Sequence, residues 1–141
     1  MKLLVACDGS KNALRAVRYA IRLAGALRDA SRITLISVHD DTALRHASRF
    51  VGQDTIDDYL REASDADLAA ARRALDKAGV AHDMMIRRGH VAAEIADAAA
   101  RGRFDMVVMG SKGRSSLADL LVGSVASRVL ELSPVPTLLV K

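Results

Sequence analysis

Three glycines at a fixed spacing are the residues of this chain whose positions best suit a chemical role. Gly110 and Gly113 follow the apolar run 106–109, and Gly123 stands before Ser124 and the helical pattern of residues 125–130. This order predicts a strand, a glycine-bounded loop and the start of a helix. Such a loop can present backbone N–H groups and a helix N-terminus to an anion such as phosphate. The spacing therefore predicts a phosphate site, and nucleotide binding is the function it favours.

The residues around these glycines admit a simpler explanation as well as a functional one. A single glycine at any of the three positions could serve a turn with positive φ, but three at this spacing favour the phosphate site. Lys112 and Arg114 would balance part of the charge of a phosphate, although each alone could be a solvated loop charge. Ser124 could bond a phosphate oxygen or simply satisfy an N–H at the start of the helix. The chain has no Walker A sequence, and its first turn, 8–10, holds one glycine, which excludes a dinucleotide fingerprint.

Asp8 ends the first apolar run and could act at the same site. Beside the glycine loop its carboxylate would accept a hydrogen bond from a ribose hydroxyl. By itself it is also explained as an Asx-turn residue, or as the N-cap of the helix that begins near Ser10. Cys7 is interpreted as a small buried hydrophobic residue, because nothing in the sequence predicts a lowered thiol pKa. The four histidines show no metal-ligand spacing.

The composition narrows the classes of function. The chain has 141 residues, typical of one domain, and 50% of them are hydrophobic, which is enough for a core. Aromatic residues make up 3%, which argues against base-stacking platforms, and the net charge of +4 is only mildly basic. A basic stripe on the first predicted helix is therefore interpreted as a solvated face, and nucleic acid is not an expected partner; the stripe holds Lys11, Arg15, Arg18 and Arg22.

Two further features bear on location. No apolar run approaches the roughly 20 residues that a membrane span needs, and the apolar N-terminal run is too short for a signal peptide. The single cysteine cannot form an internal disulfide, which fits a reducing compartment. We therefore expect a cytoplasmic protein with no membrane partner.

Short β-like runs alternate with helical stretches, which predicts an α/β fold with a parallel sheet and helices on both faces. The expected strands cover residues 3–7, 33–38, 81–87, 106–109 and 137–140. The expected helices cover residues 10–28, 55–78 and 91–101, with a further one from 125. Residues 39–54 have no clear period and are interpreted as a loop. Ligands of such sheets bind beyond the carboxyl ends of the strands, where the strand order reverses, so the first turn and the glycine loop would face one cleft.

The segment 107–130 resembles the signature segment of the universal stress protein family. It matches the pattern G-x2-G-x9-G-[ST] at every fixed position, and residues 3–13 and 133–140 are also similar to that family. The likeness covers essentially the whole chain, so a single domain over residues 1–141 is expected. The intact glycine pattern is typical of the subgroup that resembles ATP binders.

The resemblance implies a single-domain Rossmann-like fold of the adenine nucleotide alpha hydrolase-like type, with an open parallel five-stranded sheet in the order 3-2-1-4-5. It implies an ATP site where the strand order reverses, with Mg²⁺ expected alongside ATP. Ala6, Cys7 and Asp8 would line the adenine pocket, with Asp8 near the ribose, and Val38 would contact adenine through its backbone. The residues that it assigns to the phosphates and the adjoining helix start are Gly110, Lys112, Gly113, Arg114, Gly123, Ser124 and Val125.

The resemblance also implies a homodimer, often formed through the last strand. A physical reason supports this, because residues 137–140 are expected at an edge of the sheet and edge strands need cover. Pro134 and Pro136 would limit such pairing to the residues after them.

Three functions remain open at this stage. They are an ATP-binding regulatory module of the stress response, an ATPase, and a partner-binding module that binds AMP, cyclic AMP or no nucleotide. Hydrolysis needs a positioned nucleophile, a metal and charge stabilisation, and no carboxylate near the glycine loop is an obvious base; Asp119 is the nearest in sequence. We therefore expect slow hydrolysis at most, and the regulatory module is favoured. A two-component receiver domain is excluded, since Asp8 stands alone after the first strand and residues 87–89 follow the third with no aspartate.

Overall fold

One parallel sheet forms the centre of the molecule. The computed structural model describes residues 1–27, 30–114 and 121–141. Within these residues five strands pair in the order β3-β2-β1-β4-β5, and every pairing is parallel. Their bounds are β1 Lys2–Ala6, β2 Arg32–Asp40, β3 His82–Gly89, β4 Met106–Gly110 and β5 Thr137–Val140. The predicted fold class and strand order are confirmed.

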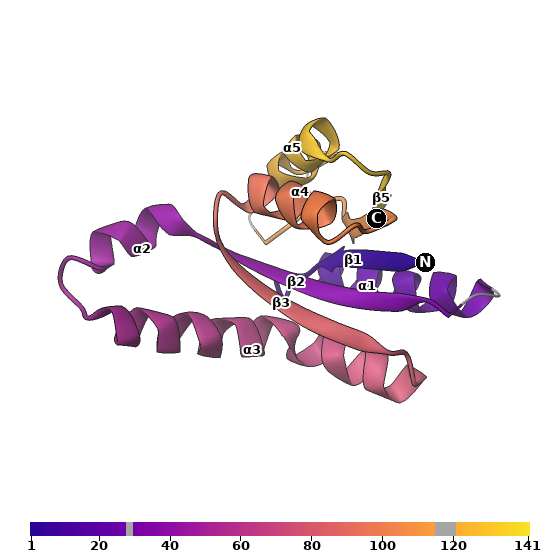
Figure 1. The fold of residues 1–141 in the computed structure, drawn as a ribbon, viewed down its shortest axis with the longest axis horizontal. Helices are drawn as coiled ribbons and strands as arrows, with labels where there is room; N and C mark the ends of the chain where they lie inside the picture. The colour runs from indigo at the N-terminus through magenta and orange to yellow at the C-terminus, as the bar shows by residue number, and fades with distance from the viewer. Residues whose placement is uncertain (28–29, 115–120) are drawn as a thin grey trace.

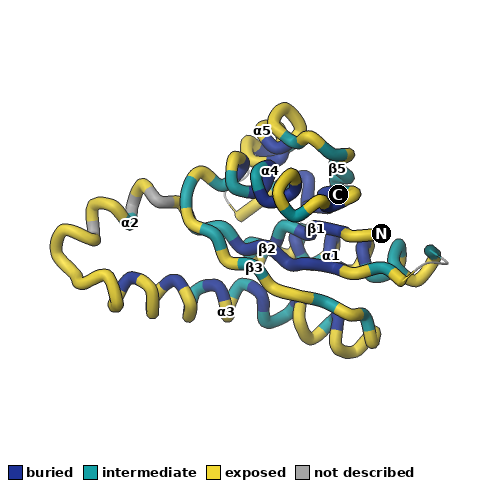
Figure 2. Tube along the Cα trace, viewed as in Figure 1, coloured by how far each residue is buried: buried dark blue, intermediate teal, exposed yellow. Residues whose placement is uncertain are grey.

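Helices cover both faces of this sheet (Figure 1). The first layer consists of α1 (Lys11–Ala26) and α3 (Gln53–Ala78), and the second of α4 (Val91–Arg101) and α5 (Ser124–Leu132). Alternate residues of β1 serve the two layers, since Leu3 packs in the cluster that contains α1 and α3 and Leu4 in the cluster that contains α4. This burial on both sides explains why the strands read as continuous apolar runs, and Figure 2 shows the central strands as buried.

The strand order brings two connecting segments to the same edge. Val5 of β1 lies opposite Val108 of β4, so the turn after β1 and the loop after β4 leave the sheet side by side. Asp8 starts the turn by accepting a hydrogen bond from the N–H of Ser10 at 2.9 Å, and the Ser10 hydroxyl accepts one from the N–H of Ala13 at 3.1 Å. The Asx-turn interpretation of Asp8 is thus confirmed, whereas the N-cap of α1 is Ser10.

The segment between β2 and α3 differs from the prediction. Strand β2 continues to Asp40, helix α2 (Asp41–Ala47) follows, and α3 begins at Gln53, so the interpretation of residues 39–54 as a loop is wrong. Asp40 caps α2 by accepting a hydrogen bond from the N–H of Thr42 at 2.7 Å. A helix of two turns is too short to show a clear period in the sequence. Figure 1 shows α2 and the start of α3 projecting beyond the sheet.

The other boundaries agree closely with the sequence prediction. Helix α1 ends at Ala26, and the predicted end at residue 28 lies outside the described residues. Helix α3 ends where Gly79 takes a left-handed conformation with φ of 65° and donates its N–H back to the helix. None of the described helices combines the length and apolarity required to cross a membrane.

Candidate functional site

A cavity of about 330 Å³ opens at the carboxyl ends of the central strands. This volume lies within the range of about 300–1,000 Å³ that is typical of small-molecule sites. All eleven residues predicted for the site line it: Ala6, Cys7, Asp8, Val38, Gly110, Lys112, Gly113, Arg114, Gly123, Ser124 and Val125. Residues from β1, β2, the loop after β4 and the start of α5 therefore converge on one space.

Sequence reasoning missed the apolar wall of this cavity. Six further residues line it, namely Ala13, Ile36, Val91, Ile95, Met109 and Ala126. Val91 and Ile95 stand one helical turn apart at the start of α4 and so present one face to the cavity. The apolar pair after the third strand is visible in the sequence, but only the strand order shows that α4 begins beside this edge.

The three signature glycines are explained by space and not by backbone angle. None of Gly110, Gly113 and Gly123 has a positive φ, so the turn explanation is wrong for them. A Cβ at Gly113 would lie 3.2 Å from Oδ2 of Asp8, and one at Gly123 would lie 3.3 Å from the Cα of Lys112. At Gly110 the Cβ would be 3.0 Å from the backbone carbonyl carbon of Asn12, so this glycine lets α1 begin against the end of β4.

The loop after β4 closes on itself at the start of α5. The N–H of Gly123 donates to the carbonyl of Ser111 at 2.7 Å, and the N–H of Ser111 donates to the carbonyl of Val140 at 2.9 Å. Gly123 is the N-cap of α5 and brings no side chain to the first N–H groups of the helix. Ser124 is the first residue of that helix and lies exposed at the cavity. This geometry offers the positive end of a helix and close backbone approach to an anionic group.

Cys7 forms part of the cavity floor and is buried. Its thiol donates to the backbone carbonyl of Asp67 at 3.6 Å, and burial raises the pKa of the thiol above its usual value. The nearby charges of Asp8 and Asp67 act in the same direction on this pKa. The interpretation of Cys7 as a buried residue is confirmed, and its surroundings favour the thiol over the reactive thiolate.

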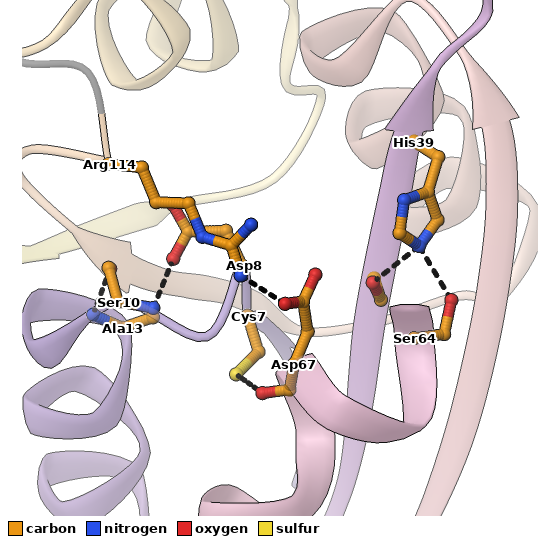
Figure 3. A network of polar contacts seen from close by, with 9 residues as sticks. Cys7, Asp8, Ser10, Ala13, His39, Ser64, Asp67 and Arg114 are labelled. Carbon is orange, nitrogen blue, oxygen red and sulfur yellow. Dashed lines mark hydrogen bonds and ion pairs between the residues drawn. The ribbon is translucent and has the colours of Figure 1, made fainter. Parts of the chain in front are cut away.

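Arg114, one of the predicted phosphate residues, has a partner within the protein. Its Nη2 atom donates to Oδ1 of Asp67 on α3, as Figure 3 shows. Asp67 was not predicted from the sequence and does not line the cavity. The contact spans 47 residues of chain, so no local pattern could have shown it.

A second polar contact pins α3 to the end of β2. The Nε2 atom of His39 lies 2.6 Å from the hydroxyl of Ser64 and 3.3 Å from that of Ser37 (Figure 3). Both serines are buried. Burial lowers the pKa of His39, the charge of Asp67 opposes this shift, and that of Arg114 adds to it. The charges of the Asp67–Arg114 pair beside the cavity therefore act on His39.

The described residues offer no ready-made metal centre. Within residues 1–27, 30–114 and 121–141, no group of three or more His, Cys, Asp or Glu side chains could hold a metal ion. Mg²⁺ is commonly held by one or two carboxylates together with substrate phosphates, so its presence with ATP stays a prediction. Asp119, the nearest carboxylate in sequence to the glycine loop, lies outside the described residues.

Comparisons with known proteins agree with this geometry. The profile of the Universal stress protein family matches residues 1–141. The universal stress protein MJ0531 of Methanocaldococcus jannaschii is 32% identical over 146 residues, which cover 99% of this chain and 81% of the relative. Among solved structures, the hypothetical protein MJ0577 has a TM-score of 0.85 at 26% identity, covering 99% of this chain and 94% of that one. A universal stress protein solved in complex with cAMP has a TM-score of 0.67 at 25% identity, covering 100% of this chain and 97% of that one. Strand order, glycine spacing and these likenesses lead to one conclusion, that the chain belongs to the universal stress protein family.

Proposed function

We propose that this protein binds an adenine nucleotide, with ATP as the expected ligand, and acts as a nucleotide-dependent regulatory module of the stress response. The observation that carries this proposal is the convergence of all eleven predicted residues on one cavity of suitable size. The universal stress protein solved with cAMP supports the class of ligand. The glycine spacing supports a ligand that carries phosphates.

The chemistry of the cavity suggests how the ligand would lie. The apolar side chains of Val38, Val91 and Ile95 would enclose the adenine, and the carboxylate of Asp8 would accept a hydrogen bond from the ribose. The phosphates would lie along the glycine loop and the start of α5, where the helix dipole favours negative charge. A triphosphate would bring Mg²⁺ with it, and we expect slow hydrolysis at most.

We also propose a cytoplasmic homodimer that forms through β5. This strand is at one edge of the sheet, and its four residues are each partly buried within the single chain. Pairing with a second copy would satisfy the open edge. Size-exclusion chromatography with light scattering should give twice the 15.1 kDa mass of one chain, and a monomer at micromolar concentration would contradict the proposal.

Titration calorimetry on protein shown to be free of co-purified nucleotide tests the proposed function. ATP with Mg²⁺, AMP and cyclic AMP are titrated in parallel, with GTP as the control for the base. We expect micromolar ATP binding, weaker AMP binding and little binding of GTP. Equal or tighter binding of AMP or cyclic AMP would favour the alternative module for those ligands. A lack of binding by every adenine nucleotide would favour a module that recognises only a protein partner.

A further inference from the structure

A salt bridge joins the loop after β4 to α3 beside the candidate site. Nη2 of Arg114 donates to Oδ1 of Asp67, and the side chain of Asp67 is 12% exposed whereas that of Arg114 is 61% exposed. Arg114 lines the cavity and Asp67 does not. Figure 3 shows the arginine side chain reaching from its loop toward the carboxylate on α3. The carboxylate of Asp67 therefore binds the guanidinium of Arg114, a cavity residue, from outside the cavity.

The turn after β1 leaves the space in which this contact forms. Gly9 has a φ of +78°, and a Cβ at this position would lie 2.7 Å from Nη2 of Arg114 and 2.8 Å from Oδ1 of Asp67. The same Cβ would be 3.1 Å from the Cα of Asp67, so α3 itself packs against the turn. The thiol of Cys7 holds the backbone carbonyl of Asp67 in addition. Cys7 thus contacts the backbone of Asp67, and Gly9 leaves the space in which its carboxylate meets Arg114.

The charge of Asp67 has a direct consequence for an anionic ligand. The carboxylate offsets much of the positive field of the guanidinium, and its own charge repels phosphates. Because Asp67 is largely buried, solvent and salt screen this charge less than they screen a surface carboxylate. Pulling Arg114 away would leave a buried carboxylate without its partner, which is costly. A triphosphate extends further along the loop and carries more charge than a monophosphate, so it experiences both effects more strongly.

Building on the proposed nucleotide site, we propose that Asp67 sets the selectivity of this protein for the number of phosphates by sharing Arg114 with the ligand. Asp67 is a positioning residue, since it acts through Arg114 and does not touch the ligand. With Asp67 present, the site distinguishes ATP from AMP less sharply than its phosphate loop would alone.

The test compares two variants of the full chain that each remove one negative charge from α3. Asp67→Asn keeps the shape of the side chain, and Asp65→Asn changes an exposed residue two positions earlier on the same helix. Affinities for ATP and AMP are measured at one ionic strength. We expect Asp67→Asn to raise the ratio of ATP affinity to AMP affinity about tenfold, whereas Asp65→Asn changes it less than about twofold.

Arg114→Gln and the double variant show whether Asp67 acts through the arginine. In the Arg114→Gln background, Asp67→Asn should no longer change the affinity ratio. A change that persists in that background would overturn the inference. So would an affinity ratio that Asp67→Asn leaves unaltered or lowers in the otherwise wild-type protein. Nucleotide binding by the wild type would still support the proposed function in either case. If the wild type binds no adenine nucleotide, both the proposed function and the inference about Asp67 are contradicted.

Thermal unfolding shows whether Asp67→Asn folds. If it does not, a different variant tests the inference. Arg114→Gln alone should then weaken ATP binding by only about threefold, because the charge of Arg114 is already shared with Asp67. A loss of about thirtyfold or more would show that the full charge of Arg114 is available to the ligand and would overturn the inference.

Discussion

The carboxyl end of the sheet has two sides that are built in different ways. On the side of α4 and α5, the cavity is bounded by the backbone of a glycine loop and by apolar side chains. On the side of α3, polar side chains close the same strand ends, with Ser64 bound to His39 and Asp67 bound to Arg114. On the first side, glycines that lack side chains leave space for a ligand. On the second side, polar side chains hold α3 against the strand ends. Substitutions on the two sides should therefore have different consequences.

The largest effect is expected on the cavity side, from Gly123→Val. The new side chain would begin 3.3 Å from the Cα of Lys112 and would occupy the approach to the first turn of α5. We expect nucleotide affinity to fall about 100-fold or more, which corresponds to roughly 3 kcal/mol, with the fold retained. Calorimetric titration measures the affinity, and circular dichroism checks the fold.

Gly25→Val is the matched control for this substitution. Gly25 lies in α1, and a Cβ there would meet nothing within 4 Å. The same chemical change should therefore leave both affinity and fold unaltered. Unchanged affinity in a folded Gly123→Val protein would break the comparison, because the space at the glycine loop would then have no part in binding.

Cys7 lies at the boundary between the two sides and should react slowly. The residue is 5% exposed, and burial raises the pKa of its thiol, so little thiolate is present at neutral pH. We expect alkylation by iodoacetamide at pH 7 to be at least about tenfold slower than in the urea-unfolded chain, and to accelerate only as the pH approaches the raised pKa. Mass spectrometry of time points measures the rate. Equal rates in the folded and unfolded chains would show that the cavity floor opens readily.

On the α3 side, Ser64→Ala should lower stability and leave nucleotide affinity nearly unaltered. The substitution removes the 2.6 Å contact with Nε2 of His39 in a buried environment. We expect the free energy of unfolding to fall by about 1 kcal/mol, as measured by urea denaturation. Ser127→Ala, at an exposed position of α5, is the control and should not destabilise the protein. A loss of affinity without a loss of stability would erase the distinction between the two sides.

The smallest effect concerns the dependence of stability on pH. Burial lowers the pKa of His39 in the folded chain, so the unfolded chain, with a pKa of about 6.5 for this residue, takes up the proton more readily. The free energy of unfolding should therefore fall as the pH drops below about 6.5 toward the lower folded pKa, and the contribution of His39 should be constant above about pH 6.5. Denaturation of the wild type and of His39→Gln between pH 5 and 7.5 measures this, and the variant should show a flatter profile. Parallel profiles would show that His39 does not contribute.

The cavity side could be predicted from the sequence, and the α3 side could not. The glycine spacing, the continuous apolar strands and the alternation of strands with helices are local patterns, and they predicted a parallel α/β fold with a phosphate loop. The resemblance to the universal stress protein family implied the strand order and the eleven lining residues. The contacts of Asp67 and Ser64 join residues 47 and 25 positions apart, and a polar residue on a helix gives no sign of a distant partner. Helix α2 was missed because two turns are too short to show a clear period.

The central place of β1 in the sheet has a consequence for how the chain is made. Leu3 pairs with Ile33 on one side and with Met106 on the other, so the second partner is synthesised about a hundred residues after the first strand. At a synthesis rate of about 5–20 residues per second, β4 is completed roughly 5–20 s after β1. During this interval an apolar strand edge stays open to other chains. The same arrangement that places the cavity at the middle of the sheet therefore leaves one edge of β1 open to association with other chains until β4 has been made.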